Sequence, residues 1–412
     1  MELQGKFGKA AVYTDVIEQE AISQIIEILN QPMMEGVKVR IMPDVHAGAG
    51  IVIGYTATIN NYIVPNFIGV DIGCGLTALP LGKTDVSFPD FDIFIRSSIP
   101  SGFSVNQKVD NQQIARILSS FAGISYNEFE TAIDEIALRV GGKNRLLNSI
   151  GSLGGGNHFI SINEDSDGNK YFVVHSGSRN FGKCIAEWHQ KTARTPVPPE
   201  DMKAAVMEIK AKTPKESIAG AIQKYYDGLP RKVKNLEYLE GKQAAAYFAD
   251  MKIAQIYAQL NRRTIVSRAA KFFSITYTEK SLIESVHNYI NFDDGIIRKG
   301  AISAHKGERI MIPLSMADGI LFCEGKGNLE WNQSAPHGAG RIMSRGKAKA
   351  AINIADYEKR MREAGVWTSC VGQETLDEAP QAYKDPSVII ESIGETVTIL
   401  DRWKEIYNFK AH

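Results

Sequence analysis

The stretch "HFISINEDSDGNKYFVVH", residues 158–175, predicts a β-hairpin. Its two halves, HFISI and KYFVVH, are strand-like, and the turn-rich NEDSDGN lies between them. If the hairpin is symmetric about this turn, His158 and His175 stand opposite each other, with Cβ atoms about 5 Å apart on one face. A slip of one residue would move one of them to the other face. The hairpin therefore predicts two imidazoles that face each other.

The segments on either side of this hairpin predict an interleaved α/β chain. Short apolar or alternating runs between residues 10 and 80, such as VKVRIMPDVH and GIVIGYTATI, indicate strands, and strands return with loops over 285–345. Residues 109–148 and 183–262 carry helical, surface-exposed patterns. Chemically interesting residues are scattered from position 44 to the end of the chain. We therefore expect one domain spanning 1–412 rather than separable modules.

The composition is that of a neutral chain with few cysteines. Its 47 basic and 47 acidic side chains neither favour nor exclude a nucleic-acid partner. Four cysteines without a C-x-x-C pair make no disulfide framework and favour a reducing compartment. The first residues lack the apolar run of a signal peptide, and no apolar run is long enough to span a membrane. We expect a cytoplasmic protein without a membrane partner, and a monomer by default.

The glycine-flanked segment VDIGCGL, residues 70–76, places a carboxylate and a thiol three positions apart, at Asp71 and Cys74. Cys74 could be a packed core residue, a nucleophile or half of a metal site. Together with several histidines, the pair has the donor types of a divalent transition-metal site. A single cysteine among an acid and imidazoles differs from the cysteine-rich pattern of structural zinc. The donor set therefore favours an open, catalytic metal site.

Six of the eight histidines stand beside Gly, Asn, Asp or Pro, where backbone can approach a ligand closely: His46, His158, His175, His287, His305 and His337. Asp44 and His46 are two residues apart, which predicts either an acid–imidazole pair on one strand face or an ordinary turn. His337, in HGAGR, has a nearby cation and could serve as a nucleophile toward phosphorus, as a general base or as a metal ligand.

Several basic residues are candidates for contacts with phosphate. Arg179 follows His175 by four residues and is the best of them. The others are Arg298, Arg341 and Arg345, the last two in GRIMSRGKAK, a run that is equally typical of a solvated helix face.

Taken together, these segments resemble the RtcB-type RNA ligases, which join RNA ends in tRNA splicing and RNA repair. The matching text, in order along nearly the whole chain, is MPDVHAGAG, GVDIGCGL, GSLGGGNHF, HSGSRN, the pair His287–Asn288, RKGAISA, the pair Ser315–Met316, GKGN, HGAGRIMSR, AYKD and Lys410. Several long motifs in a fixed order are far more specific than any one of them.

The resemblance implies an α/β fold with the active site in a central metal-containing cleft. It implies two Mn²⁺ ions bridged by Cys74, one completed by Asp71 and His158 and the other by His175 and His287. GTP would guanylylate His337, with Asp44 near this chemistry. The GMP would pass to an RNA 3′-phosphate, and a 5′-hydroxyl would then displace it. A 2′,3′-cyclic phosphate would first be opened.

The resemblance also implies which residues contact the guanine nucleotide. They are Asn157, His158, Phe159, Ile160, Ser161, His287, Asn288, Pro313, Leu314, Ser315, Met316, His337, Gly338, Ala339, Gly340 and Lys410.

Three positions depart from the family pattern. Ser161 stands where the family has a glutamate, Leu314 replaces a glycine, and Ile320 replaces a serine. The family's glutamate and serine face the guanine base. We hypothesise either that Asp318 supplies the missing carboxylate, or that base specificity is relaxed or changed.

Two other functions are kept beside the ligase. One is a metal-dependent phosphodiesterase or phosphatase acting on RNA ends, and the other is a non-catalytic RNA-end binding protein. His337 and Lys410 favour the ligase, because a hydrolase needs no nucleotide lysine and a binding protein needs no nucleophile. The physiological RNA and any activator protein are left open by the sequence.

Overall fold

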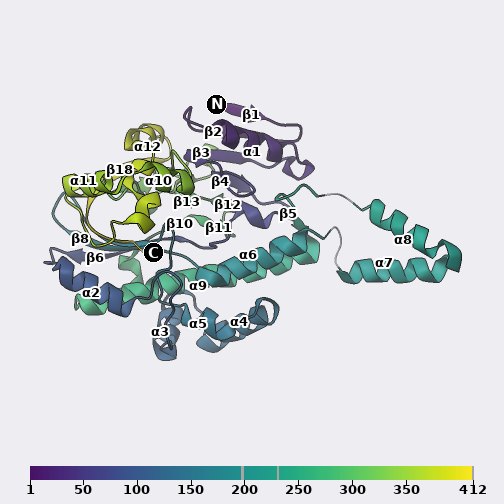
Figure 1. Cartoon of the computed structure of the whole chain (residues 1–412), viewed down its shortest axis with the longest axis horizontal. Helices are drawn as coiled ribbons and strands as arrows, with labels where there is room; N and C mark the ends of the chain where they lie inside the picture. The colour runs from purple at the N-terminus through teal and green to yellow at the C-terminus, as the bar shows by residue number, and fades with distance from the viewer. Residues whose placement is uncertain (196–198, 230–231, 411–412) are drawn as a thin grey trace.

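Segments far apart in the sequence pair within two large β-sheets. The computed structural model describes residues 1–195, 199–229 and 232–410. The first sheet has the order β1 (Glu2–Gln4), β2 (Lys9–Val12), β3 (Val39–His46), β4 (Ile53–Thr58), β12 (Ile296–Lys299) and β11 (Asn288–Asn291). Figure 1 shows this sheet, in purple and green, beside the second one.

The second sheet joins the middle of the chain to its C-terminus. Its order is β10 (Ile283–Val286), β6 (Gly75–Gly82), β8 (Lys170–Ser176), β7 (Phe159–Glu164), β18 (Val397–Lys410), β15 (Ile320–Gly325) and β14 (Arg309–Pro313), with β17 (Trp367–Thr368) parallel to β18. Short pairs β13 (Ala301–Ser303) with β16 (Ser334–Pro336), and β5 (Tyr62–Ile63) with β9 (Leu239–Glu240), complete the strands. The predicted interleaved α/β fold class is confirmed.

The predicted hairpin exists as β7 and β8, but its register differs from the prediction by one residue. His175 pairs with Phe159 rather than with His158. The loop between the strands has five residues, because the Asp165 carboxylate accepts hydrogen bonds from the backbone of Asp167 and Asn169 and so sets its length. The prediction of two directly opposed histidines is therefore wrong.

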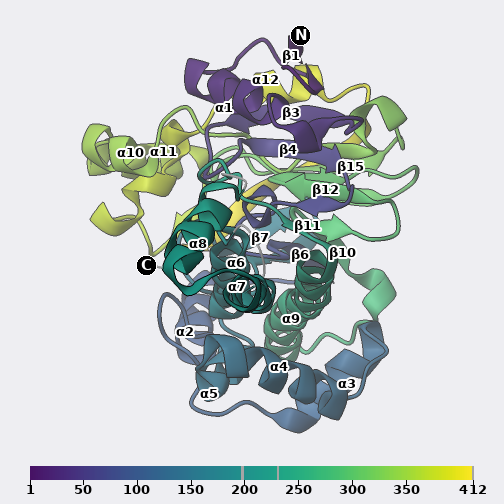
Figure 2. The same ribbon diagram turned by 90° about the vertical axis from the view of Figure 1, so that its right-hand side faces the viewer.

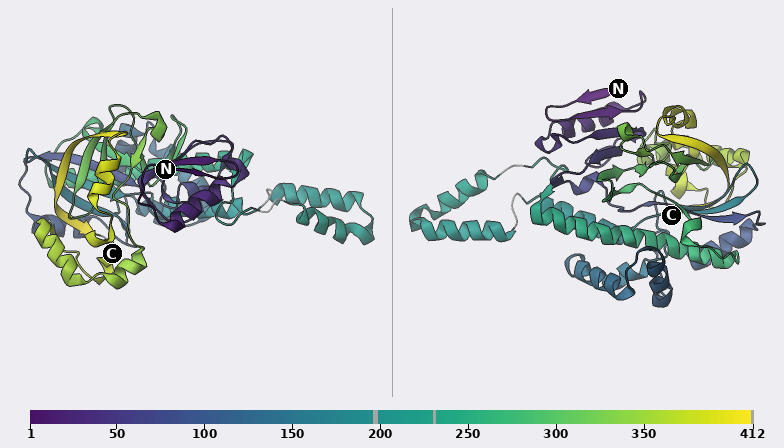
Figure 3. Two further views of the ribbon diagram at one scale, coloured as in Figure 1. Left: turned by 90° about the horizontal axis from the view of Figure 1, so that it is seen from above. Right: turned by 180° about the vertical axis from the view of Figure 1, so that it is seen from behind.

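The two predicted helical segments are confirmed. The first contains α3 (Asn111–Phe121), α4 (Tyr126–Val140) and α5 (Lys143–Asn148). The second contains α6 (Arg179–Ala193), α7 (Pro199–Lys212), α8 (Ile218–Asp227) and α9 (Gly241–Phe272), apart from residues 196–198 and 230–231, which lie outside the described residues. The long helix α9 packs against β6 and β8, and α7 with α8 extends away from the body (Figures 1 and 3).

The remaining helices lie around the sheets. They are α1 (Gln19–Leu29), α2 (Phe88–Ser98), α10 (Arg345–Ala351), α11 (Ile354–Ala364) and α12 (Pro386–Ser392). Helix α1 falls within the stretch that was predicted to be rich in strands, and it buries Ala21, Ile25, Ile28 and Leu29 on one side. Figure 2 shows α10 and α11 together on one flank of the molecule. Within the described ranges, no helix is long and apolar enough to cross a membrane.

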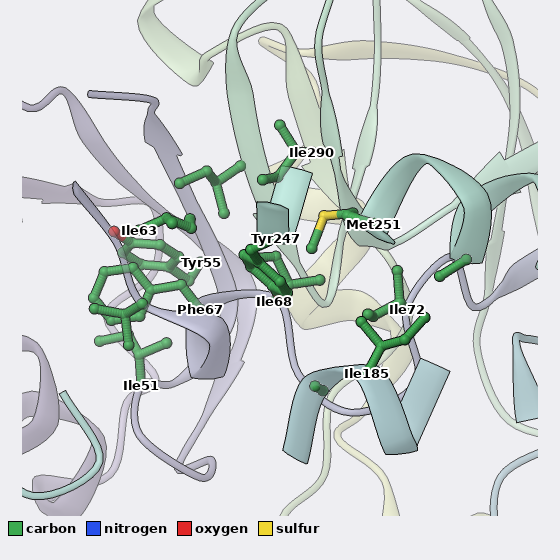
Figure 4. Packing of buried hydrophobic residues seen from close by; sticks show 14 of the residues in the cluster. Ile51, Tyr55, Ile63, Phe67, Ile68, Ile72, Ile185, Tyr247, Met251 and Ile290 are labelled. Atoms are coloured by element: carbon green, nitrogen blue, oxygen red, sulfur yellow. The ribbon is translucent and has the colours of Figure 1, made fainter. Parts of the chain in front are cut away.

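The largest hydrophobic core connects the first sheet to the helices under the second. Figure 4 shows Ile68 and Ile72 packed between Tyr247 and Met251 of α9 and Ile185 of α6. Ile68 lies three residues before Asp71, and Ile72 lies between Asp71 and Cys74. Both isoleucines are fully buried, which holds the turn that carries the two polar residues against the core.

Candidate metal centre and nucleotide pocket

The thiol of Cys74 lies at the middle of a buried cluster of imidazoles. Its Sγ is 3.4 Å from His158 Nε2 and 3.3 Å from His175 Nε2. His175 Nε2 is in turn 3.3 Å from His287 Nε2, and His158 Nε2 is 2.8 Å from a carboxylate oxygen of Asp71. The structure thus brings together all five residues that the resemblance implies as metal ligands.

These five residues form two groups that could each hold a metal ion. Cys74, His175 and His287 make one group, and Asp71, Cys74 and His158 make the other. Within each group the donor atoms lie within 4.8 Å of one another. Because Cys74 belongs to both, a thiolate there could be shared by two ions.

A tight turn before β6 places Asp71 and Cys74 at this position. The Cys74 amide donates to the carbonyl of Asp71, and Gly73 between them has a φ of 71°. A Cβ on Gly73 would lie 2.9 Å from Ala258 of α9, so only glycine lets the turn approach that helix. Arg262 of α9, which is fully buried, donates to the carbonyl of Gly73 and holds the turn against the helix.

The histidines reach the cluster from different elements. His158 lies one residue before β7, so the strand alternation does not determine its direction, and its ring centroid is 5.4 Å from that of His175. His175 is on β8, and His287 lies between β10 and β11. The imidazoles therefore converge even though the predicted cross-strand pairing is absent.

The hydrogen bonds of the ring nitrogens indicate that a cation belongs at this site. His158 and His175 each use Nδ1 to donate to a backbone carbonyl, of Leu153 and Asn157 respectively. In the neutral imidazole, the other nitrogen, Nε2, then carries a lone pair and is an acceptor. The Nε2 of His158 then faces the Asp71 carboxylate at 2.8 Å as a second acceptor. Two acceptors at that distance need a proton or a metal ion between them, so the donor set fits a metal centre.

Burial controls the protonation of this cluster. It lowers the pKa of His175 and of His287 well below the usual value, which favours the neutral, metal-binding form. Burial, and then the charge of Asp71, raise the pKa of the Cys74 thiol well above its usual value. Burial opposes ionisation of Asp71 most strongly, but the hydrogen bond and charge of His158 together with the charge of Arg179 outweigh it and lower the pKa of that carboxyl. A thiolate here therefore needs bound cations.

His337 stands beside the cluster and is oriented by a buried carboxylate. Its Nδ1 is 2.6 Å from Asp44 Oδ2, which also accepts the His337 amide at 3.1 Å. Asp44 is fully buried, and Lys384 donates to the carbonyls of the residues on either side of it. The His46 ring donates from Nδ1 to the backbone carbonyl of Asp44 at 3.0 Å, and the Asp44 carboxylate pairs with His337 instead. The ring centroids of His337 and His287 are 4.9 Å apart.

A pocket extends from His337 and the cluster toward the C-terminal strand. Most residues of the implied nucleotide site line it: Asn157, Phe159, His287, Asn288, Pro313, Leu314, Ser315, Met316, His337, Gly338, Ala339, Gly340 and Lys410. The Lys410 ammonium is 3.0 Å from a carboxylate oxygen of Glu378 and 3.2 Å from the Asn157 carbonyl. It also lies 5.3 Å from the centre of the Phe159 ring.

Three residues of that implied set do not line the pocket. His158 belongs to the cluster, and Ser161 is fully buried behind the pocket wall. Ile160 points to the opposite face of β7 and packs in a hydrophobic core with Phe172 and Phe409. Its side chain is therefore not a nucleotide contact, because successive residues of a strand alternate between faces.

The four arginines that were predicted to contact phosphate lie in different environments. Arg298 is fully buried, and its guanidinium is used by Asp294, Ser334 and two carbonyls, so the prediction of a phosphate contact is wrong there. Arg341 and Arg345 line the pocket and lie 3.3 and 3.4 Å from Glu378. Arg179 begins α6 and donates to the Gly102 carbonyl and to Ser152.

Two carboxylates in the pocket wall are absent from the sequence-based set. Glu378, at the end of the 3₁₀ helix Gln373–Glu378, binds Lys410 and accepts from the Tyr383 hydroxyl at 2.7 Å. Glu405 is on β18 and only 4% exposed. The apolar alternation of Trp403, Tyr407 and Phe409 around it was the signal that could have identified a buried acid.

Asp318, the hypothesised replacement for the family's glutamate, is engaged elsewhere. Its carboxylate accepts from the Ser315 hydroxyl at 2.5 Å and lies 3.3 Å from Arg360 and 3.6 Å from Arg402. It is not among the pocket-lining residues. Ile320 is fully buried in a hydrophobic cluster with Trp403 and Met311. The structure therefore contradicts the Asp318 hypothesis.

The burial of Glu405 predicts a pH-dependent cost in stability. Burial raises its pKa from 4.5 to about 8, so the folded chain keeps a proton that the unfolded chain releases between these values. The stability that the protonated Glu405 carboxyl contributes is complete below pH 4.5, the pKa in the unfolded chain. It is lost as the pH rises through about 8, the pKa in the folded chain. We expect Glu405→Gln to raise the free energy of unfolding by about 2–4 kcal/mol at pH 8 and hardly at pH 4.5. Denaturant unfolding of both proteins at pH 4.5 and pH 8 measures the change in the free energy of unfolding. An equal increase at both pH values, or the same increase in Glu164→Gln, would contradict the role of Glu405 burial.

The mixed α/β fold holds two candidate metal groups that share Cys74, beside a histidine oriented by Asp44, and this arrangement is compatible with a metal-dependent ligase. The family model for "tRNA-splicing ligase RtcB" matches residues 24–411, and the chain belongs to this RtcB family. It is 27% identical to the RNA-splicing ligase RtcB of Escherichia coli, over 96% of this chain and 95% of that protein. It is 24% identical to the tRNA-splicing ligase RtcB of Aeropyrum pernix, over 91% and 89%.

Proposed function

We propose that this protein is an RNA ligase that joins a 3′-phosphate or 2′,3′-cyclic phosphate end to a 5′-hydroxyl end, using GTP and Mn²⁺. The observation that carries the proposal is His337, held by the buried Asp44 next to the two candidate metal groups and within the pocket that contains Lys410. Family membership supports RNA ends as the substrate. We further propose that residues 1–412 act as one monomeric catalytic domain.

Five side chains would hold the metal ions: Asp71, Cys74, His158, His175 and His287. Divalent ions held there would supply Lewis acidity that polarises phosphate oxygens. The Nδ1 hydrogen bonds of His158 and His175 to backbone carbonyls keep their Nε2 atoms free for this role. These carbonyls therefore orient the ligands.

His337 would act as the nucleophile. Its Nδ1–H bond to Asp44 leaves the lone pair on Nε2. Attack by Nε2 on the α-phosphorus of GTP forms a P–N bond and breaks the bond to the bridging oxygen, so pyrophosphate leaves. The buried Asp44 carboxylate stabilises the positive charge that develops on the ring, as an acid does for an imidazole base.

The RNA steps would follow on the histidine–GMP intermediate. Water first opens a cyclic end to a 3′-phosphate. An oxygen of the 3′-phosphate attacks the phosphorus of the adduct, returning His337 and forming an activated RNA end. The 5′-hydroxyl then attacks the 3′-phosphorus, loses its proton and releases GMP. Arg345, which lines the pocket and is 47% exposed, is suited to contact these phosphates. The Arg341 guanidinium already binds Glu378 and the carbonyls of Met343 and Asp377.

The test is a paired labelling and ligation assay on the full chain with Mn²⁺. We expect an acid-labile covalent label from α-labelled GTP, and joining of RNA fragments with matching 3′-phosphate and 5′-hydroxyl ends. Opening of cyclic phosphate without any label or joining would contradict the ligase and favour a metal-dependent phosphodiesterase.

Asp44→Asn tests the positioning of the nucleophile. We expect the rate of labelling to fall by about 10²–10⁴-fold, because the neutral amide neither fixes the tautomer nor balances the imidazolium charge. Metal content should be unchanged, since Asp44 is outside both metal groups. The single-turnover labelling rate and elemental analysis measure the two quantities. The control is Asp401→Asn, a carboxylate outside the pocket; similar rates in both variants would rule out this role.

A further inference from the structure

Four buried polar side chains gather behind the nucleotide pocket, where β7 and β18 pair. We name Ser161, Asn163, Glu405 and Asn408 the β7–β18 polar cluster. Each is at most 4% exposed, and Glu405 and Asn408 also line the pocket. Burying polar groups costs folding free energy unless they are hydrogen-bonded, so a cluster of four needs a physical reason.

A bulge in β18 brings the cluster onto one face. Asn408 pairs with Ser161 and Glu405 with Asn163, and the register shifts between Glu405 and Tyr407. Residues 405 and 408 are an odd number of positions apart and would face opposite sides of a regular strand. The bulge at Ile406 places both on the face that carries Lys410 and Phe159. That face leads from the metal groups, through Phe159 and Lys410, to Glu405.

The hydrogen bonds of the cluster leave acceptors unused. Asn408 donates to Glu405 at 2.7 Å, and Asn163 donates to Ser161 at 2.8 Å. The side-chain oxygens of Asn163 and Asn408 are buried and have no partner among the described residues. Within the same residues, no cation forms an ion pair with Glu405, whose burial raises its pKa to about 8. Once Glu405 is ionised, the acceptors of the cluster therefore outnumber its hydrogen-bond donors.

We propose that Glu405, supported by Asn408, is the base-specificity residue of this protein and binds the Watson–Crick edge of guanine. This inference rests on the proposed function, in which a nucleotide occupies the pocket. Guanine presents two adjacent donors, N1–H and the 2-amino group, which match one carboxylate, and O6 beside them is an acceptor for the Lys410 ammonium. No other common base offers this order of one acceptor and two donors.

The same arrangement accounts for Ser161. The carboxylate that the family carries at this position of β7 is supplied here from the neighbouring strand, because Glu405 lies on the same face, next to the pair Ser161–Asn408. The loop residue Gly319 fits closely against this strand: a Cβ there would lie 3.4 Å from the Glu405 amide and 2.1 Å from the Trp403 carbonyl. The pocket wall thus closes directly over Glu405.

The experiment measures equilibrium binding of GTP, ITP and ATP with Mn²⁺ to the full chain carrying His337→Ala, which prevents turnover. ITP lacks only the 2-amino group. In this parent we expect GTP to bind at least about tenfold more tightly than ITP. Adding Glu405→Gln should weaken GTP binding by about 10–100-fold and reduce the preference over ITP to less than about threefold.

Two matched controls separate this role from general effects. Glu164→Gln changes the carboxylate next to Asn163 on the opposite face of β7, and Asp318→Asn removes the acid held by Arg360. Neither should alter GTP or ITP binding. Glu405→Asp provides a second variant that keeps the charge but withdraws the carboxylate, and it should also lose the preference for GTP over ITP.

The outcomes distinguish a failure of the Glu405 inference from a failure of the proposed function. Unchanged GTP and ITP binding in both Glu405 variants would overturn the inference and leave the proposed function intact. Loss of selectivity in Asp318→Asn instead would also overturn it. A parent that binds no nucleotide, together with wild-type protein that forms no label from any of the four triphosphates, would overturn the proposed function and this inference with it.

Discussion

His337→Ala is expected to abolish the covalent label from α-labelled GTP, reducing it by at least about 10³-fold, to background. The structure offers His337 as the nucleophile because Asp44 binds its Nδ1 at 2.6 Å, which leaves Nε2 for attack. An imidazole–phosphorus bond is labile in acid and stable in base, so the chemical lability of the label reports its type. The measurement is denaturing electrophoresis of the labelled protein after acid or alkali treatment.

The control for this variant is His305→Ala. His305 is paired with Asp294 and Glu308 outside the pocket, and it should label as wild type does. The metal content of His337→Ala should also stay at the wild-type level, because His337 belongs to neither metal group. A base-stable, acid-labile label that persists in His337→Ala would place the nucleophile on another nitrogen side chain, a histidine or a lysine.

Cys74→Ala is expected to remove metal binding and labelling together. Because Cys74 is the residue common to both candidate metal groups, its loss leaves two donors in each. The affinity for both ions should fall by more than the roughly 10–100-fold that outer-shell changes cause. Elemental analysis of the purified protein and the labelling assay, run on the same preparation, measure the two losses.

Cys184→Ala is the matched control, since this half-exposed cysteine on α6 contacts Asn180 and lies outside the cluster. It should retain both metal and label. Two metal ions per chain in Cys74→Ala would show that the thiol is a packed residue. Metal retained with labelling lost would instead assign Cys74 to a later step than ion binding.

Several features of the fold could be predicted from residue patterns alone. The helices within 109–148 and 183–262 were predicted from apolar residues that recur with helical spacing, such as Ile133, Ile136 and Val140 of α4. Helix α1 was missed although Ala21, Ile25 and Ile28 have the same spacing, because strand patterns dominate the surrounding text. The hairpin β7–β8 was predicted, but its register was not, because the Asp165 side chain decides the loop length.

The candidate site likewise combines residues that the sequence predicted with contacts that it did not. Residue types alone predicted a metal site with Asp71, Cys74 and several histidines, and the resemblance to the RtcB-type RNA ligases implied the particular five ligands and His337. Asp44 was first paired with its neighbour His46, yet its carboxylate binds His337, 293 residues away. Arg298 has the charge of a phosphate ligand and is instead buried inside an internal network. Charge and spacing cannot show whether a guanidinium is already occupied.

The residue types and their order along the chain specify the chemistry that this protein can carry: its thiol, carboxylate and imidazoles, and the segments that hold them. Which of these groups come into contact depends on the three-dimensional fold. The clearest case is Glu405, because one extra residue in β18 moves it to the pocket face, beside the Ser161 that departs from the family pattern. A strand has a period of two, so a single bulge reverses every side chain beyond it. Such a bulge depends on pairing with distant strands, and no local pattern records it.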